Sequence, residues 1–451
     1  MKNRLKILLY VLAISIFTFA LLPAILNGTP ASPAVGNWYQ QFMPSIGNRN
    51  ITDVFFLDSL TGWAVTNATN IGNDTTFVLK TTNSGDTWVI QFRKLQTGGG
   101  FPGYFRIIFL NSQTGYTCGV NGVDKTIDGG NSWTSINAPL NSYVDMQITG
   151  IDSIYTVSTN SLTGGIFRTT NGGLNWEQQL NLGSQNPGKI YMYNGRIGFA
   201  STGAGLYKTT NSGSNWNNIS GNGTFFDMYF KDSLNGWKSR QLMDRTTDGG
   251  ITWITQTLPT GGNIILNYLL KFAYVKTDTI FGVGGLAIVP NGARGFIYRS
   301  INGGNTWEYQ IPDTAIHAPQ YQYIKNINSN LWAYWFLSGI HTTNGGDPIW
   351  LTGIEQISTE IPKKYKLYQN YPNPFNPYTN IKYQITNNKS FVHLTIYDVA
   401  GREVIKLVNK VQNAGTYKVD WNAAGYSSGI YFYSLTVNRK IVETKKMVLI
   451  K

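Results

Sequence analysis

The sequence has one cysteine, three histidines and few charged residues. Because Cys118 has no second cysteine to pair with, the chain is not a disulfide-stapled scaffold. Charged residues make up 13% of the chain, about half of the roughly 25% that is usual, and this share excludes a coiled coil and an acidic disordered chain. The histidines (His317, His341 and His393) are too scattered to predict a metal site. No glycine-rich loop joins a strand to a helix, so we expect neither metal nor cofactor.

Glycine and aromatic residues are abundant instead. The 451 residues include 49 Gly, 13 Trp, 27 Tyr and 22 Phe. With few strong helix formers, this composition is typical of many short strands joined by tight turns. We therefore expect an all-β protein.

The N-terminal segment has the layout of a secretory signal. Lys2, Arg4 and Lys6 precede an apolar run from Ile7 to Leu26, and small residues follow up to Ala34. The alternative is a retained membrane anchor, since about 20 apolar residues can span a bilayer. Because no basic stop-transfer flank follows the apolar run, we favour a cleaved Sec signal that spans residues 1–34.

The net charge of +13 is unevenly distributed. Residues 1–36 hold three cations and no acids, and residues 351–451 hold 14 cations and six acids. Residues 37–350 therefore keep 19 cations against 17 acids, a net of +2. A nucleic-acid-binding domain concentrates its basic residues on the binding surface. This near-neutral region predicts no nucleic-acid partner.

An eight-residue repeat motif, with the pattern Thr-x-Asn/Asp-x-Gly-x-x-Trp, recurs through this region. Its copies are Thr81–Trp88, Thr126–Trp133, Thr169–Trp176, Thr209–Trp216, Thr246–Trp253, Ser300–Trp307 and, one residue longer, Thr342–Trp350. Successive tryptophans lie between 37 and 54 residues apart. Such a period suits one four-stranded sheet per repeat, the unit of a propeller.

The motif's residue types suit a hairpin turn. Asn or Asp at the third position accepts hydrogen bonds from backbone N–H groups two residues on. Gly at the fifth position tolerates positive φ, and the Trp buries a large apolar surface. A carboxylate that alternates freely with an amide is not a general acid. We therefore assign a structural role to Asn83, Gly85, Trp88, Asp128, Gly130, Trp133, Asn171, Gly173, Trp176, Asn211, Gly213, Trp216, Asp248, Gly250, Trp253, Asn302, Gly304, Trp307, Asn344, Gly346 and Trp350.

A second pattern precedes most copies, as in Ile51–Val65 and Phe226–Trp237, and reads as two strands joined by a polar turn. The repeat motif resembles the Asp box, or bacterial neuraminidase repeat. Together with Ile51–Val65 it is similar to propellers related to the photosystem II stability and assembly factor. The resemblance implies a seven-bladed β-propeller over residues 37–350. It is specific for fold and poor for function.

The ends of this region predict how the ring closes. Asn37–Phe42 (NWYQQF) resembles Asn175–Leu180 (NWEQQL), which follows a repeat motif. We expect this N-terminal strand to complete the last blade beside Tyr321–Thr343. The alternative is that Trp350–Gln356 forms the missing strand.

Catalytic carboxylates are scarce. Glycoside hydrolysis usually needs two facing carboxylates about 5–10 Å apart. The two glutamates of the middle region, Glu177 and Glu308, each follow a motif Trp and are expected on outermost strands. Asp145, Asp227 and Asp278 remain, so a sialidase-like or other glycan-active hydrolase stays open as the alternative to a non-catalytic protein.

Each repeat motif is preceded by a residue that is basic or can become so: Lys80, Lys125, Arg168, Lys208, Arg245, Arg299 and His341. A ring of cations could hold an acidic partner. The peripheral position favours strand residues whose long side chains cover apolar neighbours.

A ligand-binding face is expected on the long loops between blades. These loops are Gln96–Tyr104, Pro259–Tyr268, Val289–Arg294 and Ile311–Tyr323. From them we select Tyr104, Tyr268, Arg294 and Tyr321 as ligand-face candidates.

The last hundred residues form a separate unit. We expect a linker over residues 351–364 and a small Ig-like β-sandwich over residues 365–451. Leu367–Pro377 (LYQNYPNPFNP), Leu394–Val408, Ala414–Leu435 and the basic end at Lys445–Lys451 resemble the type A C-terminal sorting domain of the type IX secretion system. The resemblance implies a Bacteroidota-type host, the type IX secretion machinery as a partner, and a secreted or outer-surface location.

The sequence thus predicts a secreted or cell-surface, non-catalytic propeller. We expect it to be a monomer whose ligand is a glycan, a peptide or an envelope component.

Overall fold

The computed structural model describes residues 38–450 except 48, 69–73, 97–102, 140–141, 160–161, 186–187, 204, 221–224, 241, 262, 277, 290–291, 313–317, 319, 347–350 and 352. The expected signal segment, Trp350 of the seventh motif and most of the loop before Tyr104 lie outside the described residues. No helix among the described residues is long and apolar enough to cross a membrane.

Seven antiparallel sheets occupy the described chain from Tyr39 to Thr342. The first three are built from β2 (Ile51–Phe56), β3 (Gly62–Thr66), β4 (Asp74–Thr81) and β5 (Val89–Gln96); β6 (Tyr104–Phe109), β7 (Gly115–Gly119), β8 (Gly122–Thr126) and β9 (Thr134–Ile136); and β10 (Tyr143–Gly150), β11 (Ser153–Ser158), β12 (Gly165–Thr169) and β13 (Glu177–Asn181). The next two are built from β14 (Lys189–Met192), β15 (Gly198–Ser201), β16 (Leu206–Thr209) and β17 (Asn217–Ser220); and β18 (Asp227–Phe230), β19 (Gly236–Ser239), β20 (Met243–Thr246) and β21 (Ile254–Gln256). A 3-10 turn, η1 (Gly183–Gln185), lies between β13 and β14.

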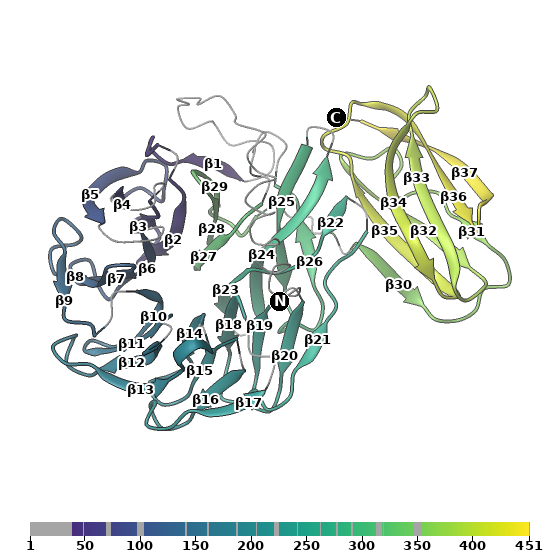
Figure 1. Ribbon diagram of the computed structural model, residues 1–451. Helices are drawn as coiled ribbons and strands as arrows, with labels where there is room; N and C mark the ends of the chain where they lie inside the picture. The colour runs from purple at the N-terminus through teal and green to yellow at the C-terminus, as the bar shows by residue number, and fades with distance from the viewer. Residues whose placement is uncertain are drawn as a thin grey trace.

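The sixth sheet has five strands: β22 (Ile264–Leu266), β23 (Lys271–Lys276), β24 (Thr279–Val289), β25 (Gly292–Ser300) and β26 (Glu308–Gln310). The seventh combines β27 (Tyr323–Ile327), β28 (Asn330–Trp335) and β29 (Ser338–Thr342) with β1 (Tyr39–Phe42) from the start of the described chain. Strands β2, β6, β10, β14, β18, β23 and β27 contact one another in a closed succession, so each sheet contributes one inner strand. Figure 1 shows the sheets set side by side around this centre, and the fold is a β-propeller.

The ring closes through its N-terminal strand, as the sequence predicted. β1 pairs antiparallel with β29, in a register that runs from Tyr39 opposite His341 to Phe42 opposite Ser338. Trp38, directly before β1, is fully buried and donates from Nε1 to Oε1 of Gln310 at 2.8 Å. Closure therefore joins residues nearly 300 positions apart in the sequence.

The repeat motifs form turns of one design, seen in the copy that begins at Thr169. The Thr169 hydroxyl donates to Oδ1 of Asn171 (2.9 Å) and accepts from the backbone N–H of Gly173 (3.0 Å). Oδ1 of Asn171 also accepts from the N–H of Asn175 at 2.9 Å. The prediction of an N–H two residues on was wrong: the acceptor reaches four residues on because two consecutive residues adopt positive φ, here Gly172 (67°) and Gly173 (97°).

The turn is reproduced along the chain. Both hydroxyl contacts occur in all seven copies. In the six copies whose last residues are described, the N–H of the seventh residue donates to Oδ1 of the third. The first, third and fifth residues of each motif are thus bonded to one another within the turn, while tryptophans such as Trp88 and Trp216 pack in the apolar cores.

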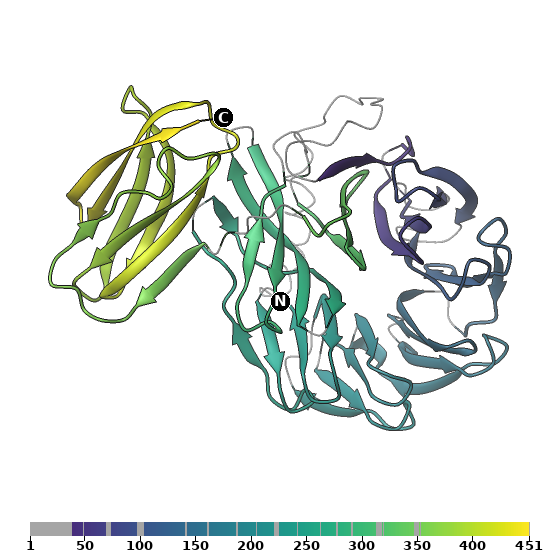
Figure 2. The same cartoon turned by 180° about the vertical axis from the view of Figure 1, so that it is seen from behind.

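The C-terminal unit has two packed sheets. One contains β30 (Ile354–Ser358), β35 (Gly415–Asn422), β32 (Tyr378–Ile385) and β31 (Lys366–Leu367); the other contains β34 (Glu403–Gln412), β33 (Ser390–Tyr397), β36 (Gly429–Val437) and β37 (Lys440–Leu449). Their facing side chains form one apolar core that includes the fully buried Trp421. Figure 2 shows this sandwich beside the long β24–β25 hairpin of the propeller.

Part of the expected linker is structured. Ile354–Ser358 forms β30 because its backbone pairs with β35 and the Ile354 side chain packs against the sandwich core. The N–H of Ile354 also donates to the carbonyl oxygen of Thr260 at 2.7 Å. The segment therefore connects the sandwich directly to the stretch of chain between β21 and β22.

Candidate functional site

The inner strands place one polar side chain from each sheet around the centre of the propeller. We call this set the inner ring; it consists of Asp53, Arg106, Asp145, Lys189, Asp227, Lys271 and Tyr323. Carboxylates and cations alternate in chain order over the first six sheets, and Tyr323 takes the seventh position. A ring of seven positions cannot alternate in charge all the way round, because a charged seventh residue would lie next to a like charge on one side. The neutral Tyr323 between Lys271 and Asp53 avoids this.

Each aspartate of the inner ring joins its own sheet to the next one. Oδ2 of Asp53 accepts from the backbone N–H of Ile107 (3.1 Å) on β6. In the same way Asp145 accepts from the N–H of Ile190 at 3.1 Å, and Asp227 accepts from the N–H of Phe272 at 2.9 Å. The three aspartates are thus inter-sheet joints at regular intervals.

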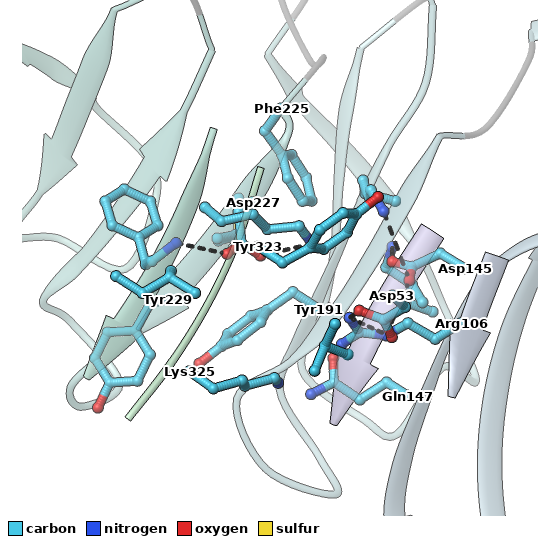
Figure 3. Close-up of a pocket in the computed structure, with 17 residues that line it drawn as sticks. Asp53, Arg106, Asp145, Gln147, Tyr191, Phe225, Asp227, Tyr229, Tyr323 and Lys325 are labelled. Carbon is cyan, nitrogen blue, oxygen red and sulfur yellow. Dashed lines mark hydrogen bonds and ion pairs between the residues drawn. The ribbon is translucent and has the colours of Figure 1, made fainter. Parts of the chain in front are cut away.

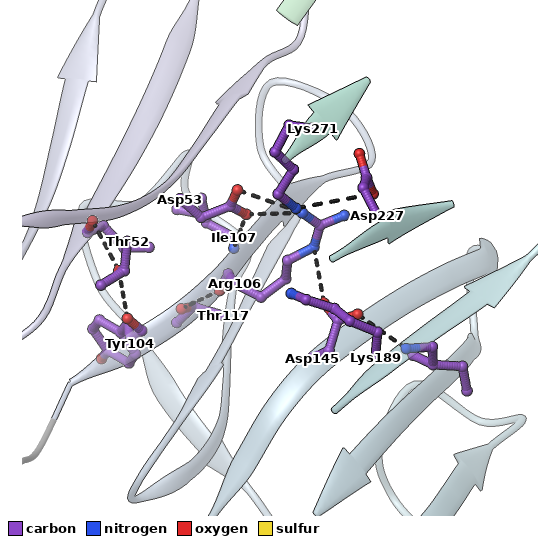
Figure 4. Close-up of polar contacts among 12 residues, drawn as sticks. Thr52, Asp53, Tyr104, Arg106, Ile107, Thr117, Asp145, Lys189, Asp227 and Lys271 are labelled. Carbon is purple, nitrogen blue, oxygen red and sulfur yellow. Dashed lines mark hydrogen bonds and ion pairs between the residues drawn. The ribbon is translucent and has the colours of Figure 1, made fainter. Parts of the chain in front are cut away.

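Ion pairs add to these joints, as Figure 4 shows. Arg106 lies between two carboxylates, 3.4 Å from Asp53 and 3.5 Å from Asp145. Nζ of Lys189 is 3.8 Å from Asp145, and Nζ of Lys271 is 4.0 Å from Asp227. The lysine pairs are long, so each lysine keeps hydrogen-bonding capacity for another acceptor.

The surroundings shift the protonation of these groups. Burial opposes ionisation of Asp145, but Lys189 and Arg106 outweigh it and hold its pKa below the ordinary value. Burial lowers the pKa of Lys271 to about 8, although Asp227 counteracts it. At neutral pH Asp145 is therefore ionised and Lys271 is mostly protonated.

Two positions further along the inner strands lies a second layer. It comprises Phe55, Ile108, Gln147, Tyr191, Tyr229, Ala273 and Lys325. Gln147 accepts from the N–H of Met192 at 2.9 Å, and the Tyr191 hydroxyl accepts from the N–H of Phe230 at 2.9 Å. Nζ of Lys325 lies 5.6 Å from the centroid of the Phe55 ring.

The inner ring, together with Gln147, Tyr191, Tyr229 and Lys325 of the second layer, lines a cavity of about 160 Å³, shown in Figure 3. Phe225 is also part of its wall. The site thus combines charged groups with aromatic rings, a lining suited to holding a small charged ligand.

The carboxylates that could have served a hydrolase lie far apart or already form ion pairs and hydrogen bonds within the protein. Glu177 opens β13 and Glu308 opens β26, both outermost strands, as predicted. Asp278 is exposed and pairs with Lys231 at 2.8 Å. Asp145 and Asp227 do line the cavity, but each is committed to a lysine and a backbone N–H. A general acid needs a raised pKa, whereas the pKa of Asp145 is lowered.

The four predicted ligand-face residues are not brought together in a surface site. Tyr104, Arg294 and Tyr321 are 2%, 3% and 1% exposed. The Tyr104 hydroxyl donates to Asp124 at 2.7 Å, and only Tyr268 is half-buried. The prediction placed these residues on loops, but Tyr104 begins β6 and Arg294 lies within β25, so their side chains enter the core.

The cations that precede the repeat motifs cover aromatic neighbours. Nζ of Lys208 lies 5.5 Å from the Phe199 ring centroid and donates to the carbonyl oxygen of Gly249 in the next sheet's turn. Equivalent ring contacts are made by Lys80, Lys125, Arg168 and Arg245. His341 stacks on Trp332 with 4.8 Å between ring centroids. These six residues thus contact aromatic rings, and Arg299 pairs with Glu308 on the neighbouring strand at 2.7 Å.

The described residues contain no cluster of three or more His, Cys, Asp or Glu side chains that could hold a metal ion. Cys118 is buried, and burial raises its pKa, so its thiol is protonated at neutral pH.

Comparison with known proteins identifies the C-terminal unit. Residues 369–451 match the family model described as the secretion system C-terminal sorting domain. This tail directs secretion. The chain is therefore exported to the cell surface or beyond it, and its tail interacts with the type IX secretion machinery. No curated protein matches the sequence.

Solved structures resemble the chain in fold. YCF48 bound to a D1 peptide has a TM-score of 0.51 and 18% identity, covering 70% of this chain and all of that one. PorZ, a surface component of the type IX secretion system of Porphyromonas gingivalis, has a TM-score of 0.44 and 14% identity, covering 93% and 61%. A GH74 enzyme of Niastella koreensis has a TM-score of 0.39 and 12% identity, covering 84% of each chain. At 18% identity the likeness to YCF48 shows the propeller fold alone.

The inner ring was the feature that sequence reasoning missed. Asp145 and Asp227 were considered one at a time, as isolated carboxylates. Aligning the first strands of successive repeats would have shown acid and base alternating at a single strand position. The signal lay in the comparison between repeats, since no single strand reveals it.

Proposed function

We propose that this protein is a non-catalytic binding propeller, secreted or displayed on the outer cell surface, whose ligand is a glycan, a peptide or an envelope component. The observation that supports this most is the commitment of the cavity carboxylates. Asp53, Asp145 and Asp227 each accept a backbone N–H from the next sheet and each lie within 4.0 Å of a cation, so all three already hold neighbouring sheets together. The cations that face them remain available to a ligand.

Several finer assignments belong to the same proposal. The seven sheets are the blades of a complete Asp-box ring over residues 37–350, preceded by a cleaved Sec signal and followed by the sorting unit over residues 365–451. The chain is a monomer made by a Bacteroidota-type bacterium. A peptide is a reasonable ligand class because the YCF48 propeller was solved with one bound.

A binding screen tests the function. The purified full chain is incubated with glycan, peptide and cell-envelope libraries, and both retention and chemical turnover of each compound are measured. We expect saturable binding without a new product. Turnover that disappears in Asp227→Asn would instead establish the alternative, a glycan-active hydrolase, for which the presence of both Asp145 and Asp227 in one cavity is the supporting observation.

Export is tested separately in the native host. Deletion of residues 365–451 should abolish surface and culture-medium protein while precursor accumulates inside the cell envelope. Undiminished surface protein after this deletion would show that another segment directs export.

A further inference from the structure

The cavity between the inner strands carries an excess of positive charge. Its lining includes three carboxylates, Asp53, Asp145 and Asp227, against four cations, Arg106, Lys189, Lys271 and Lys325. The excess is one positive charge, enclosed by side chains rather than spread over an open surface. A half-enclosed charge is stabilised when a counter-charge reaches it.

Lys325 is where this excess lies. Arg106, Lys189 and Lys271 each have an aspartate oxygen within 3.4–4.0 Å. Within the described part of the chain Lys325 forms no such pair; its nitrogen instead lies over the Phe55 ring. Burial, followed by the nearby Arg106, lowers the pKa of Lys325, and Asp53 and Asp227 counteract this only in part.

We propose that this cavity binds a single carboxylate group, with Lys325 as its charge partner and Lys189 and Lys271 as flanking donors. The inference rests on the proposed binding function and names the chemistry of its ligand. The carboxylate could belong to a free organic acid or to an acidic side chain of a peptide.

The same lining disfavours larger anions. A phosphate or sulfate dianion would neutralise the excess charge and then place a second negative charge among Asp53, Asp145 and Asp227, which repel it. The cavity of about 160 Å³ also limits the ligand to a slender group. Phe225 and Tyr229 in the wall can pack against the short carbon chain that carries the carboxylate.

A matched pair of probes tests the proposal on the purified full chain by isothermal titration calorimetry. N-acetyl-aspartate amide carries a carboxylate where N-acetyl-asparagine amide carries a neutral amide of the same shape. We expect the aspartate probe to bind at least tenfold more tightly. Acetate serves as the free-acid arm: acetate binding without aspartate-probe binding assigns a free organic acid, and binding of both assigns a carboxylate that a peptide can present.

Variants locate the binding. Lys325→Met, which keeps the length of the side chain but removes its charge, should weaken carboxylate binding at least tenfold, and Lys325→Arg should retain it. Lys231→Met is the matched control, since Lys231 pairs with the exposed Asp278 away from the cavity. Unchanged binding in a folded Lys325→Met variant would overturn the proposal. Equal affinity for the two amide probes would also overturn it if acetate does not bind either.

The outcome is separable from that of the proposed function. If the library screen finds a neutral glycan or peptide while no carboxylate probe binds, the binding function stands and the carboxylate inference fails.

Discussion

Asp145 and Arg106 lie on neighbouring inner strands with 3.5 Å between Oδ1 and Nε, and Asp145 also accepts a backbone N–H from the strand on its other side. One carboxylate therefore links three consecutive sheets: its own, that of Arg106 and that of Ile190. The inner strands lie where the sheets of a propeller come closest to one another. A bond between inner strands therefore fixes the positions of the whole sheets relative to one another.

This relationship predicts that Asp145→Asn lowers stability. The amide keeps the shape and can still accept from Ile190, but Lys189 loses its counter-charge and Arg106 keeps only that of Asp53. We expect the free energy of unfolding to fall by about 1–3 kcal/mol. Chemical denaturation of the variant and of Asp278→Asn measures the effect. Asp278 is an exposed partner of Lys231, so its variant should lose less than about 1 kcal/mol. Equal losses in the two variants would contradict a special role for the inner ring.

The contribution of the turn hydrogen bonds to stability can be measured by comparing substitutions at two adjacent threonines, Thr169 and Thr170. Thr169→Val removes a hydroxyl that both donates to Asn171 and accepts from the N–H of Gly173, while keeping the β-branched shape. It leaves a buried N–H without its acceptor, so we expect a loss of about 1–3 kcal/mol. Thr170→Val changes the next side chain, which is exposed, and should alter stability by less than about 0.5 kcal/mol. Thermal unfolding followed by circular dichroism compares the two.

The turns were predictable because their chemistry is local. Asn171 and Gly173 lie within one eight-residue motif, and the copies in other repeats reveal which positions tolerate change. The ring closure was also predictable, since Asn37–Phe42 resembles a strand found after a repeat motif and needed a partner. Both inferences compared short segments between repeats, and neither required knowing which distant side chains lie together in the folded protein.

The candidate site was not predictable in the same way. Lys325 and Asp145 are separated by 180 positions and line the same cavity only because the sheets form a ring. Tyr104 illustrates the opposite error: a tyrosine after a glycine-rich loop looked exposed, yet it begins a strand and its hydroxyl is satisfied by Asp124. Burial depends on which strand lies opposite, and the local sequence does not specify that strand.

Ring closure by β1 predicts that the first described residues stabilise the whole propeller. Trp38 is fully buried and bonded to Gln310, so Trp38→Ala should cost about 3–5 kcal/mol. Phe42→Ala is the matched control, because Phe42 lies at the other end of β1 and is 38% exposed. Urea denaturation of the two variants gives the comparison. If Trp38→Ala lost no more stability than Phe42→Ala, the N-terminal strand would not be what secures the ring.

The closing sheet should also make stability depend on pH. His341 lies opposite Tyr39 in the β1–β29 pair and stacks on Trp332, and burial lowers its pKa to about 4 despite the nearby Asp86. In the unfolded chain a histidine has a pKa of about 6.5, so between pH 6.5 and 4 the unfolded state binds a proton that the folded state does not. Stability from this group is therefore complete above pH 6.5 and is lost as the pH falls towards 4.

We expect a loss of about 2 kcal/mol between pH 7 and pH 5 from His341 alone. His341→Gln keeps a side chain able to bond with Asn330 but does not titrate, so the difference between wild type and variant isolates this contribution from other acid-dependent groups. Unfolding free energies at pH 7, 6 and 5 should converge between the two proteins as the pH decreases. Parallel curves would mean that His341 takes up a proton in the folded sheet as readily as in the unfolded chain, and that its burial against Trp332 does not oppose the charge.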